Sequence, residues 1–219
     1  MDNELLLFDR INVIKDIINK YGADNFYLSF SGGKDSTILH YLVDMAIPNN
    51  NIPRVFINTG IEYNYIVDFV KELAEHDDRF VILKPSKPIK ITLDTYGYPF
   101  KSKEHSLRVN HFNKGTNANY LQKYLNGYDY KGKKTTFVCP QILKYQFEER
   151  GKYNYSNRCC YELKKKPVHQ WEKENNKTIA ITGMRSTEGG NRKRLGCIIT
   201  DAKKNVVKFH PLIKVDDKF

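Results

Sequence analysis

The run Ser31-Gly32-Gly33-Lys34-Asp35-Ser36 constrains this chain more than any other feature. It follows an apolar, β-prone stretch at 26–30 and precedes a helical pattern over about 36–46. A strand, a tight glycine turn and a helix N-terminus form an anion site, because glycines let the backbone approach a phosphate and free N–H groups point at it. The spacing differs from the Walker loop, which has four residues between its first glycine and its Gly-Lys pair. The run therefore predicts a phosphate-binding loop of another type.

The side chains of this loop suit the same ligand. Lys34 adds a mobile cation, and nearby hydroxyl groups add donors. Asp35 is a candidate contact for Mg²⁺, or it only braces the loop. The alternative interpretation is an ordinary glycine turn between a strand and a helix. The residues expected to bind the cofactor here are Ser29, Ser31, Gly32, Gly33, Lys34, Asp35, Ser36 and Thr37.

Hydrophobic patterning along the chain predicts alternating strands and helices. The expected strands are 26–30, 54–58, 80–83, 178–182 and 206–209. The expected helices are 4–20, 36–46, 62–76 and 158–175. This alternation is typical of an α/β protein with a doubly wound, mostly parallel, five-stranded sheet. We expect a single domain over 1–219.

Residues 84–157 break this rhythm, because they are rich in Lys, Tyr, Asn and Gly and show only short patterns. They predict an insertion with short helices around 104–112 and 117–125. Such an insertion would cover the substrate site or form a partner surface.

Composition excludes some classes of protein. Hydrophobic residues make up 40% of the 219-residue chain, and no stretch of about 18 apolar residues occurs, so we expect no membrane span. The N-terminus lacks a signal-peptide pattern, and the chain has four cysteines, which together indicate a cytoplasmic protein with thiols or metal ligands rather than disulfides. The net charge of +11 indicates a nucleic-acid partner or, alternatively, a lysine-rich solvated surface.

Two further segments follow predicted strands. Asn58-Thr59-Gly60 ends the second strand, and Gly183 with Arg185 and Arg192 follows the fourth. Ligands of open α/β sheets bind at the carboxyl edge of the strands, where these segments are expected. Each arginine can make a forked contact with phosphate or sulfate oxygens, and Glu188 can hold one of them in place. The alternatives are a surface loop, and a glycine turn with Thr59 as the cap of the next helix.

With these motifs the chain resembles the phosphoadenosine-phosphosulfate reductase family, a branch of the ATP-pyrophosphatase superfamily. The matching pieces are the loop at 31–36, Phe-Ile-Asn-Thr-Gly at 56–60, Cys159-Cys160 with Lys164 and Pro167, the Gly-Met-Arg…Glu…Arg run at 183–192, and His-Pro-Leu-Ile at 210–213. The resemblance implies an adenine nucleotide alpha hydrolase-like fold and a phosphate site at 31–36. It also implies that Lys164 and Arg185 face the substrate anion and that Asn58 lies by the nucleotide.

The form of the loop separates three functional hypotheses. Sulfonucleotide reductases of this family usually carry a degraded loop and a cysteine in a C-terminal tail, whereas this chain keeps the full loop and ends at Phe219 without a tail cysteine. The first hypothesis is therefore an enzyme that splits ATP into AMP and pyrophosphate to adenylate a substrate in sulfur transfer, with Lys34, Asp35, Lys164 and Arg185 as catalytic residues. The second is a sulfonucleotide reductase, and the third is a non-enzymatic subunit that binds nucleotide or nucleic acid. The ending at Phe219 is expected of a truncated chain or of one that needs a partner.

Four cysteines match the ligand count of a [4Fe–4S] cluster, namely Cys139, Cys159, Cys160 and Cys197. Related iron–sulfur reductases use an adjacent cysteine pair as cluster ligands, and we expect these four thiols to converge around a cluster. Zinc and free thiols are the alternatives. The expected cofactors are thus ATP, Mg²⁺ and the cluster. The expected partners are an adenine nucleotide, a nucleic acid or a sulfur-carrier protein, and a second copy of the chain or a partner subunit.

Overall fold

The computed structural model describes residues 3–116 and 118–215. They group into two compact units. The first, here called the sheet unit, comprises Met1–Lys84 and Pro167–Phe219, and the second, here called the inserted unit, comprises Pro85–Lys166. The expectation of a single domain stays a prediction.

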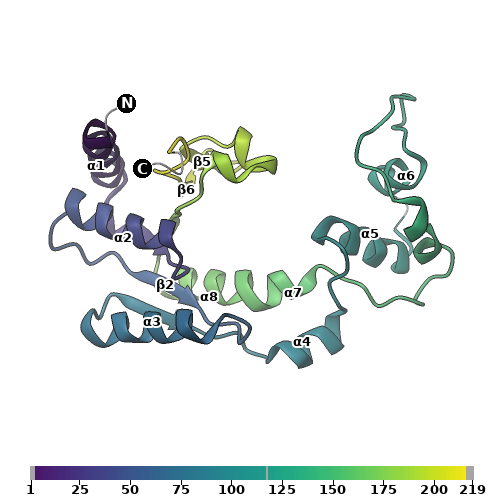
Figure 1. Cartoon of the computed structure of the whole chain (residues 1–219), viewed down its shortest axis with the longest axis horizontal. Coiled ribbons are helices and arrows are strands. Elements are labelled where there is room, and N and C mark those ends of the chain that lie inside the picture. The colour runs from purple at the N-terminus through teal and green to yellow at the C-terminus, as the bar shows by residue number, and fades with distance from the viewer. Residues whose placement is uncertain (1–2, 117, 216–219) are drawn as a thin grey trace. The chain divides into compact units, whose positions relative to one another are not determined.

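The sheet unit is built on a six-stranded sheet in the order β3-β2-β1-β4-β6-β5. Strands β2, β5 and β6 of this sheet are labelled in Figure 1. The strands are β1 (Phe26–Ser29), β2 (Arg54–Ile57), β3 (Phe80–Leu83), β4 (Ile179–Ile181), β5 (Ile198–Thr200) and β6 (Val206–Phe209). All neighbouring pairs are parallel except β5 with β6. The prediction of a doubly wound, mostly parallel α/β sheet is confirmed. The expected count of five strands missed β5, because three residues are too few to show a period.

Side chains that alternate along the strands bury both faces of the sheet. Phe26 and Leu28 of β1 pack in the larger core with α1 (Asn3–Tyr21), α2 (Lys34–Ala46) and α3 (Asn64–His76). Tyr27, between them, packs on the opposite face with Trp171 of α8 (Lys166–Glu174). Since a strand places successive side chains on opposite faces, one sequence supplies both cores. The first three predicted helices, 4–20, 36–46 and 62–76, are confirmed within two residues at each end.

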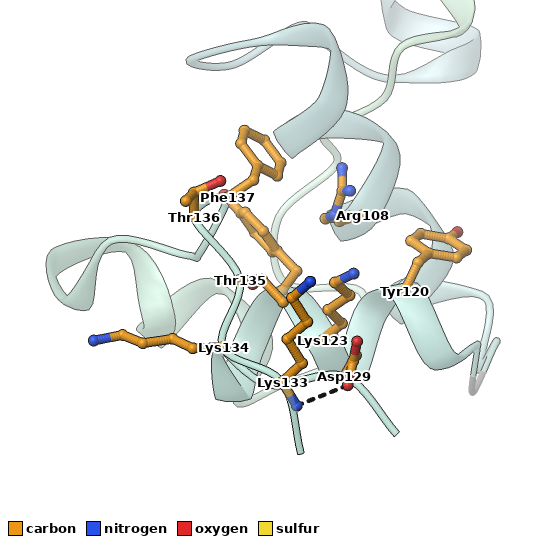
Figure 2. Close-up of a pocket in the computed structure, with 10 residues that line it drawn as sticks. Arg108, Tyr120, Lys123, Asp129, Lys133, Lys134, Thr135, Thr136 and Phe137 are labelled. Atoms are coloured by element: carbon orange, nitrogen blue, oxygen red, sulfur yellow. Dashed lines mark hydrogen bonds between the residues drawn. The ribbon is translucent and has the colours of Figure 1, made fainter. Parts of the chain in front are cut away.

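The inserted unit is mainly helical. It contains α4 (Ile89–Tyr96), α5 (Lys103–Asn113), α6 (Asn119–Asn126), a 3₁₀ segment (Gln141–Phe147), α7 (Arg158–Cys160) and a π-helical turn (Tyr161–Lys165). The helices predicted at 104–112 and 117–125 correspond to α5 and α6, although residue 117 lies outside the described residues. Helix α4 was not predicted, because its β-branched Ile and Thr residues weaken helix propensity. A pocket in this unit is lined by residues of α5, α6 and the segment 129–137 (Figure 2).

The helix expected over 158–175 is not uniform. The π-helical turn at Tyr161–Lys165 interrupts it and leads into α8 next to Pro167. Proline has no N–H to donate to the residue four positions earlier, so a local change in hydrogen bonding at this point is expected. Within the described residues, no helix combines the length and the apolar character needed to cross a bilayer.

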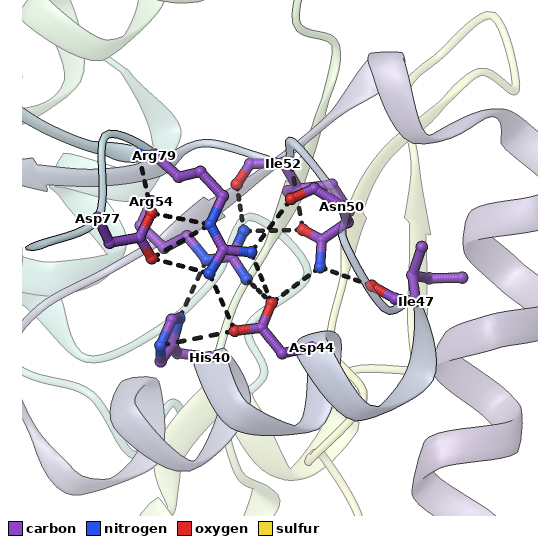
Figure 3. Close-up of polar contacts among 8 residues, drawn as sticks. All are labelled: His40, Asp44, Ile47, Asn50, Ile52, Arg54, Asp77 and Arg79. Atoms are coloured by element: carbon purple, nitrogen blue, oxygen red, sulfur yellow. Dashed lines mark hydrogen bonds and ion pairs between the residues drawn. The ribbon is translucent and has the colours of Figure 1, made fainter.

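A partly buried ionic network ties α2 to Arg54 of β2 and to Arg79, the residue before β3 (Figure 3). The side chain of Arg54 is fully buried, and its Nη2 lies 2.6 Å from Oδ1 of Asp44. Arg79 Nη1 lies 2.7 Å from the same carboxylate oxygen, and Arg54 Nε donates to Nδ1 of His40 at 3.1 Å. Burial lowers the pKa of Arg54 to about 10, with Asp44 opposing that shift. This network fixes the body of α2, whose N-terminus forms the candidate site.

Candidate functional site

The loop after β1 has a backbone that only glycine suits at position 32. Gly32 has φ +74°, and a Cβ built there would lie 2.7 Å from Cγ2 of Ile66 on α3. Gly33 then caps α2, with φ −88° and ψ 163°. The glycine pair thus turns the chain tightly from strand to helix, and it packs the turn against α3.

Hydroxyl groups close this loop on itself. Ser36 Oγ donates to the carbonyl of Gly33 at 2.8 Å and accepts from the Ser31 N–H at 3.2 Å. Thr37 Oγ1 donates to the same carbonyl at 3.1 Å. Ser36 is buried, whereas Ser29, Ser31 and Lys34 are exposed. The first turn of a helix leaves its N–H groups without intrahelical acceptors, so the rigid loop presents backbone donors together with Lys34.

The segment after β2 lies at the same carboxyl edge of the sheet. The carboxylate of Glu62 accepts from the N–H of Thr59 at 2.8 Å and from its hydroxyl at 2.8 Å. The N–H of Gly60 donates to Oδ1 of Asn58 at 3.0 Å. The alternative interpretation with Thr59 as a helix cap is wrong, because Tyr63 is the N-cap of α3. Glu62 was missed, although the Thr-x-x-Glu spacing of a capping box is a signal that could have found it.

The loop after β4 contacts the start of α2. Arg185 Nε lies 3.3 Å from Oδ1 of Asp35, and the Arg185 side chain is only 8% exposed. A Cβ on Gly183 would lie 3.0 Å from the carbonyl carbon and oxygen of Asp35. Strands β1 and β4 are neighbours, which brings their following loops together. Asp35 therefore braces Arg185, and the absence of a side chain at Gly183 allows this close approach.

Glu188 organises the rest of the same loop. Its Oε2 accepts from the Arg185 N–H at 3.1 Å, and its Oε1 lies 2.5 Å from Nη1 of Arg192. The Arg192 side chain is 46% exposed, so it borders solvent while Arg185 is enclosed. The two arginines thus differ in environment: Arg185 is enclosed beside Asp35, whereas Arg192 pairs with Glu188 at the solvent-exposed side of the loop.

Lys164 belongs to the inserted unit, on the π-helical turn. On the same turn, Glu162 lies 2.9 Å from Nη2 of Arg158 and 3.1 Å from Nζ of Lys166. Burial raises the pKa of Glu162, but the hydrogen bonds from Arg158 and Lys166 outweigh it and hold the pKa below its usual value. The expected contact of Lys164 with a substrate anion stays a prediction.

The prediction that four cysteines converge around a metal cluster is not supported by the structure. Among residues 3–116 and 118–215, no group of three or more His, Cys, Asp or Glu side chains could hold a metal ion. Cys139 is buried, and its Sγ lies 3.6 Å from the carbonyl of Pro140, while Cys197 packs against the core of the sheet unit. Cys160 lies 3.8 Å from Nζ of Lys103. All four are free thiols.

Two curated relatives match part of the chain. An uncharacterized protein from Methanocaldococcus jannaschii is 31% identical over 93 residues, which is 42% of this chain and 22% of the relative. An NH₃-dependent NAD⁺ synthetase from Halalkalibacterium halodurans is 31% identical over 114 residues, which is 48% of this chain and 40% of the relative. The chain thus spans less than half the length of these relatives.

Two solved structures have partial similarity to this chain. A phosphoadenylyl-sulfate reductase from Candida auris, in a phosphate complex, has a TM-score of 0.46 at 14% identity, covering 95% of this chain and 80% of that one. An FMN adenylyltransferase from Candida glabrata has a TM-score of 0.47 at 13% identity, covering 96% and 52%.

A family model covers most of the chain. The model of the phosphoadenosine phosphosulfate reductase domain matches residues 25–139 and 130–218. These ranges include the loop at 31–36 and the loop after β4, the two segments that meet at Asp35 and Arg185. The protein belongs to the phosphoadenosine phosphosulfate reductase domain family, whose model spans both sides of this candidate nucleotide site.

Proposed function

We propose that this protein binds ATP with its phosphates over residues 31–37 and splits it into AMP and pyrophosphate to adenylate a substrate. The observation that carries the proposal is the contact between the two loops. Asp35, at the start of α2, pairs with the buried Arg185 from the loop after β4. A guanidinium beside a helix N-terminus and Lys34 concentrates donors and positive charge in one place, as a polyphosphate requires.

In the proposed step, a nucleophilic atom of the acceptor attacks the α-phosphorus of ATP. The bond between the α-phosphorus and the bridging oxygen breaks, and pyrophosphate leaves with that electron pair while the acceptor releases its proton. Negative charge builds up on the leaving pyrophosphate. Lys34 and the loop amides would stabilise that charge, and fixed donors of this kind reduce the barrier most when they are already in place. Gly183, Arg192 and the Asn58-Thr59-Gly60 segment would border the nucleotide.

Mg²⁺ fits this site mainly as a partner of the phosphates. Mg²⁺ in nucleotide enzymes is usually held by one or two carboxylates together with substrate phosphates. Asp35 supplies one carboxylate, and Arg185 already pairs with it. Asp35 therefore acts first as a brace, and any metal contact it makes is shared with the phosphates. The residues do not fit a four-cysteine cluster, so no step of the proposed reaction passes through one.

Reduction of a sulfonucleotide is the second candidate, favoured by the match to the reductase domain model. The same loop would then hold the phosphates of adenylyl sulfate, and a thiol would be the reductant. Adenylation for sulfur transfer would instead bring a sulfur-carrier protein, or a partner subunit, to the site. The cytoplasm, with its reducing conditions, suits either reaction.

Nucleotide turnover distinguishes these candidates. The purified chain is incubated with Mg²⁺ and α-labelled ATP, and AMP and pyrophosphate are measured with and without cell extract as a source of acceptor. Binding of α,β-methylene-ATP, which cannot be split at the proposed bond, is measured by calorimetry. AMP with pyrophosphate supports the proposal, whereas ADP with phosphate, or binding of adenylyl sulfate without binding of the ATP analogue, overturns it.

Lys34→Ala tests the site itself. We expect turnover to fall about a hundredfold, the scale of losing one charged stabiliser of the transition state. Lys15→Ala is the matched control, because Lys15 is an exposed lysine on α1 and its removal changes the net charge equally. Equal turnover in the two variants would show that residues 31–37 are not the phosphate site.

A further inference from the structure

The net positive charge of this chain comes entirely from the inserted unit. Residues 85–166 contain 17 Lys and Arg against 6 Asp and Glu, a net charge of +11, which equals the net charge of the whole chain. The sheet unit is therefore neutral overall, with 19 basic and 19 acidic residues. A solvated, lysine-rich surface would spread its charge over both units. An excess of basic residues concentrated in one unit is typical of a surface that binds a polyanion.

The same unit holds 10 of the 15 tyrosines. Several of its aromatic side chains face solvent, where they gain nothing from burial. Tyr130 is 80% exposed, Tyr128 is 55% exposed and Phe137 is 50% exposed. Exposed aromatic rings interleaved with lysines are typical of surfaces on which unpaired bases stack.

A pocket of about 610 Å³ brings the two kinds of side chain together (Figure 2). Its cations are Arg108 from α5, Lys123 from α6, and Lys133 and Lys134 from the segment that follows. Its rings are Tyr120, Tyr124 and Phe137. The volume is within the usual range for small-molecule sites and is large enough for a nucleotide.

The acidic groups near the pocket are already engaged. The carboxylate of Asp129 accepts from the N–H groups of Lys131 and Lys133, at 2.9 Å each, and so closes the turn at 129–133. Glu104 pairs with Arg108 at 2.8 Å. In the part of the chain that the structure describes, no ion pair involves Lys123 or Lys133. These two ammonium groups therefore remain available for a ligand that brings its own negative charge.

Polar groups hold two rings of the pocket, Tyr124 and Phe137, in place. The Arg108 guanidinium lies 4.7 Å from the ring centroid of Tyr124 and 4.8 Å from that of Phe137. The Tyr124 hydroxyl is 2.8 Å from Nδ1 of His105, a fully buried residue whose Nε2 is 2.8 Å from Oε1 of Gln146. Rings held in this way lose little conformational freedom on binding, which favours stacking.

Buried polar atoms at the pocket also lack partners. Arg108 Nε and the hydroxyl groups of Tyr120 and Thr135 are buried without a hydrogen bond among the described residues. A buried donor left unsatisfied costs free energy, so such atoms mark a place where a polar ligand is accommodated. Phosphate oxygens and base edges are ligands of that kind.

We propose that the inserted unit binds single-stranded nucleic acid, with a base stacked on the half-exposed ring of Phe137 and the adjoining phosphates on Lys123 and Lys133. A single strand is favoured over a duplex because the rings need an unpaired base face to contact. This binding site is separate from the loop at 31–37, and it does not depend on ATP.

The test is fluorescence anisotropy with the full-length protein and no ATP. The probes are labelled 12-nucleotide RNA, DNA of the same sequence, and the corresponding duplex, over a series of salt concentrations. We expect either or both single strands to bind at least about tenfold more tightly than the duplex, the effect of one or two stacked bases. No binding, equal binding of the duplex, or equally effective competition by inorganic polyphosphate would overturn the proposal.

Variants separate stacking from charge. Phe137→Leu keeps an apolar side chain at this half-exposed position, and we expect about tenfold weaker binding with an unchanged salt slope. Lys123→Ala with Lys133→Ala should reduce the slope of log K against log salt by about 1.4, because each phosphate contact of a single strand contributes about 0.7. Lys90→Ala, which removes an exposed lysine of α4 outside this pocket, is the control. Losses in Lys90→Ala as large as half those of the double variant would mean diffuse charge attraction and would overturn the pocket assignment.

Discussion

Nε of Arg185 lies 3.3 Å from Oδ1 of Asp35, although 150 positions separate the two residues in the sequence. The pair joins the start of α2 to the loop after β4. Both side chains are largely enclosed, at 8% and 26% exposure. The contact joins the motif at 31–36 to the Gly-Met-Arg motif at 183–185.

Replacing Arg185 with Lys should impair nucleotide binding although it keeps the charge. A lysine presents a point charge and cannot make forked contacts with two oxygens, so we expect binding of α,β-methylene-ATP to weaken about tenfold. Calorimetry measures it. Arg194→Lys, at an exposed position of the same region, is the control. If both variants bind like the parent protein, Arg185 does not contact the nucleotide.

Gly183→Ala should disturb the site without removing any functional group. The new Cβ would lie 3.0 Å from the backbone of Asp35, closer than ordinary van der Waals contact, so the two loops must shift apart by a few tenths of an ångström. We expect a loss of binding of about tenfold or more, with a stability cost of about 1–3 kcal/mol from overpacking. Gly196→Ala is the matched control, because its Cβ would meet nothing closer than 3.6 Å. Parent-like binding in Gly183→Ala would show that the contact is dispensable.

Gly32→Ala should destabilise the sheet unit more than Gly60→Ala. Both glycines have positive φ, +74° and +85°, so each alanine carries backbone strain of about 1–2 kcal/mol. Only the Cβ at position 32 would also meet Ile66, at 2.7 Å, while nothing lies within 4 Å at position 60. Urea unfolding should therefore show an additional loss of about 1–3 kcal/mol for Gly32→Ala. If both variants lose the same free energy of unfolding, glycine is needed at position 32 for its backbone angle and not for the contact with Ile66.

Asp44→Ala should be strongly destabilising. It would leave the fully buried Arg54 without its ion-pair partner, and breaking a buried pair costs about 3–5 kcal/mol. Asp68→Ala removes the exposed pair with Lys71 and should cost less than about 1 kcal/mol. Thermal and urea unfolding of both variants compare the two pairs. A small effect at Asp44 would show that His40, Asn50 and the Ile52 carbonyl satisfy Arg54 without the carboxylate.

The stability of the sheet unit should fall as the pH is lowered through about 6.5. Burial lowers the pKa of His40 and of His210, and nearby cations lower both further, although Asp44 and Asp77 oppose part of the shift at His40. The unfolded chain then binds protons near pH 6.5 that the folded chain does not, so stability is present above that pH and is lost progressively below it. The single tryptophan, Trp171, belongs to this unit and reports its unfolding by fluorescence.

His210→Gln tests the origin of this pH dependence. The His210 ring is buried, with Nδ1 2.6 Å from the Thr182 hydroxyl. Because glutamine does not titrate, the dependence between pH 7.5 and 5.5 should become shallower even if the variant is less stable overall. A slope identical to that of the parent protein would assign the effect to other groups.

Local chemistry in the sequence was enough to predict much of the fold. The loop at 31–36 needs glycine for its positive backbone angle and hydroxyl groups for its internal hydrogen bonds. Both requirements are visible in residues that are neighbours in the sequence. Alternation of short apolar strands with amphipathic helices predicted a mostly parallel sheet, because each element buries one face or both. The three-residue β5 was too short to be recognised in this way.

Contacts between distant segments were decided only by the tertiary structure. The sequence contained Asp35, Gly183 and Arg185, but their proximity depends on β1 and β4 becoming neighbours in the sheet. The four cysteines had the correct count for a cluster, yet Cys139 is buried within the inserted unit, while Cys197 is partly buried against the core of the sheet unit. The net charge was visible in the composition, whereas its confinement to the inserted unit appears only when the two units are defined. A local motif depends on hydrogen bonds and backbone angles within one turn of the chain. A site assembled from several loops depends on how distant segments pack together, and the sequence of one segment does not determine that packing.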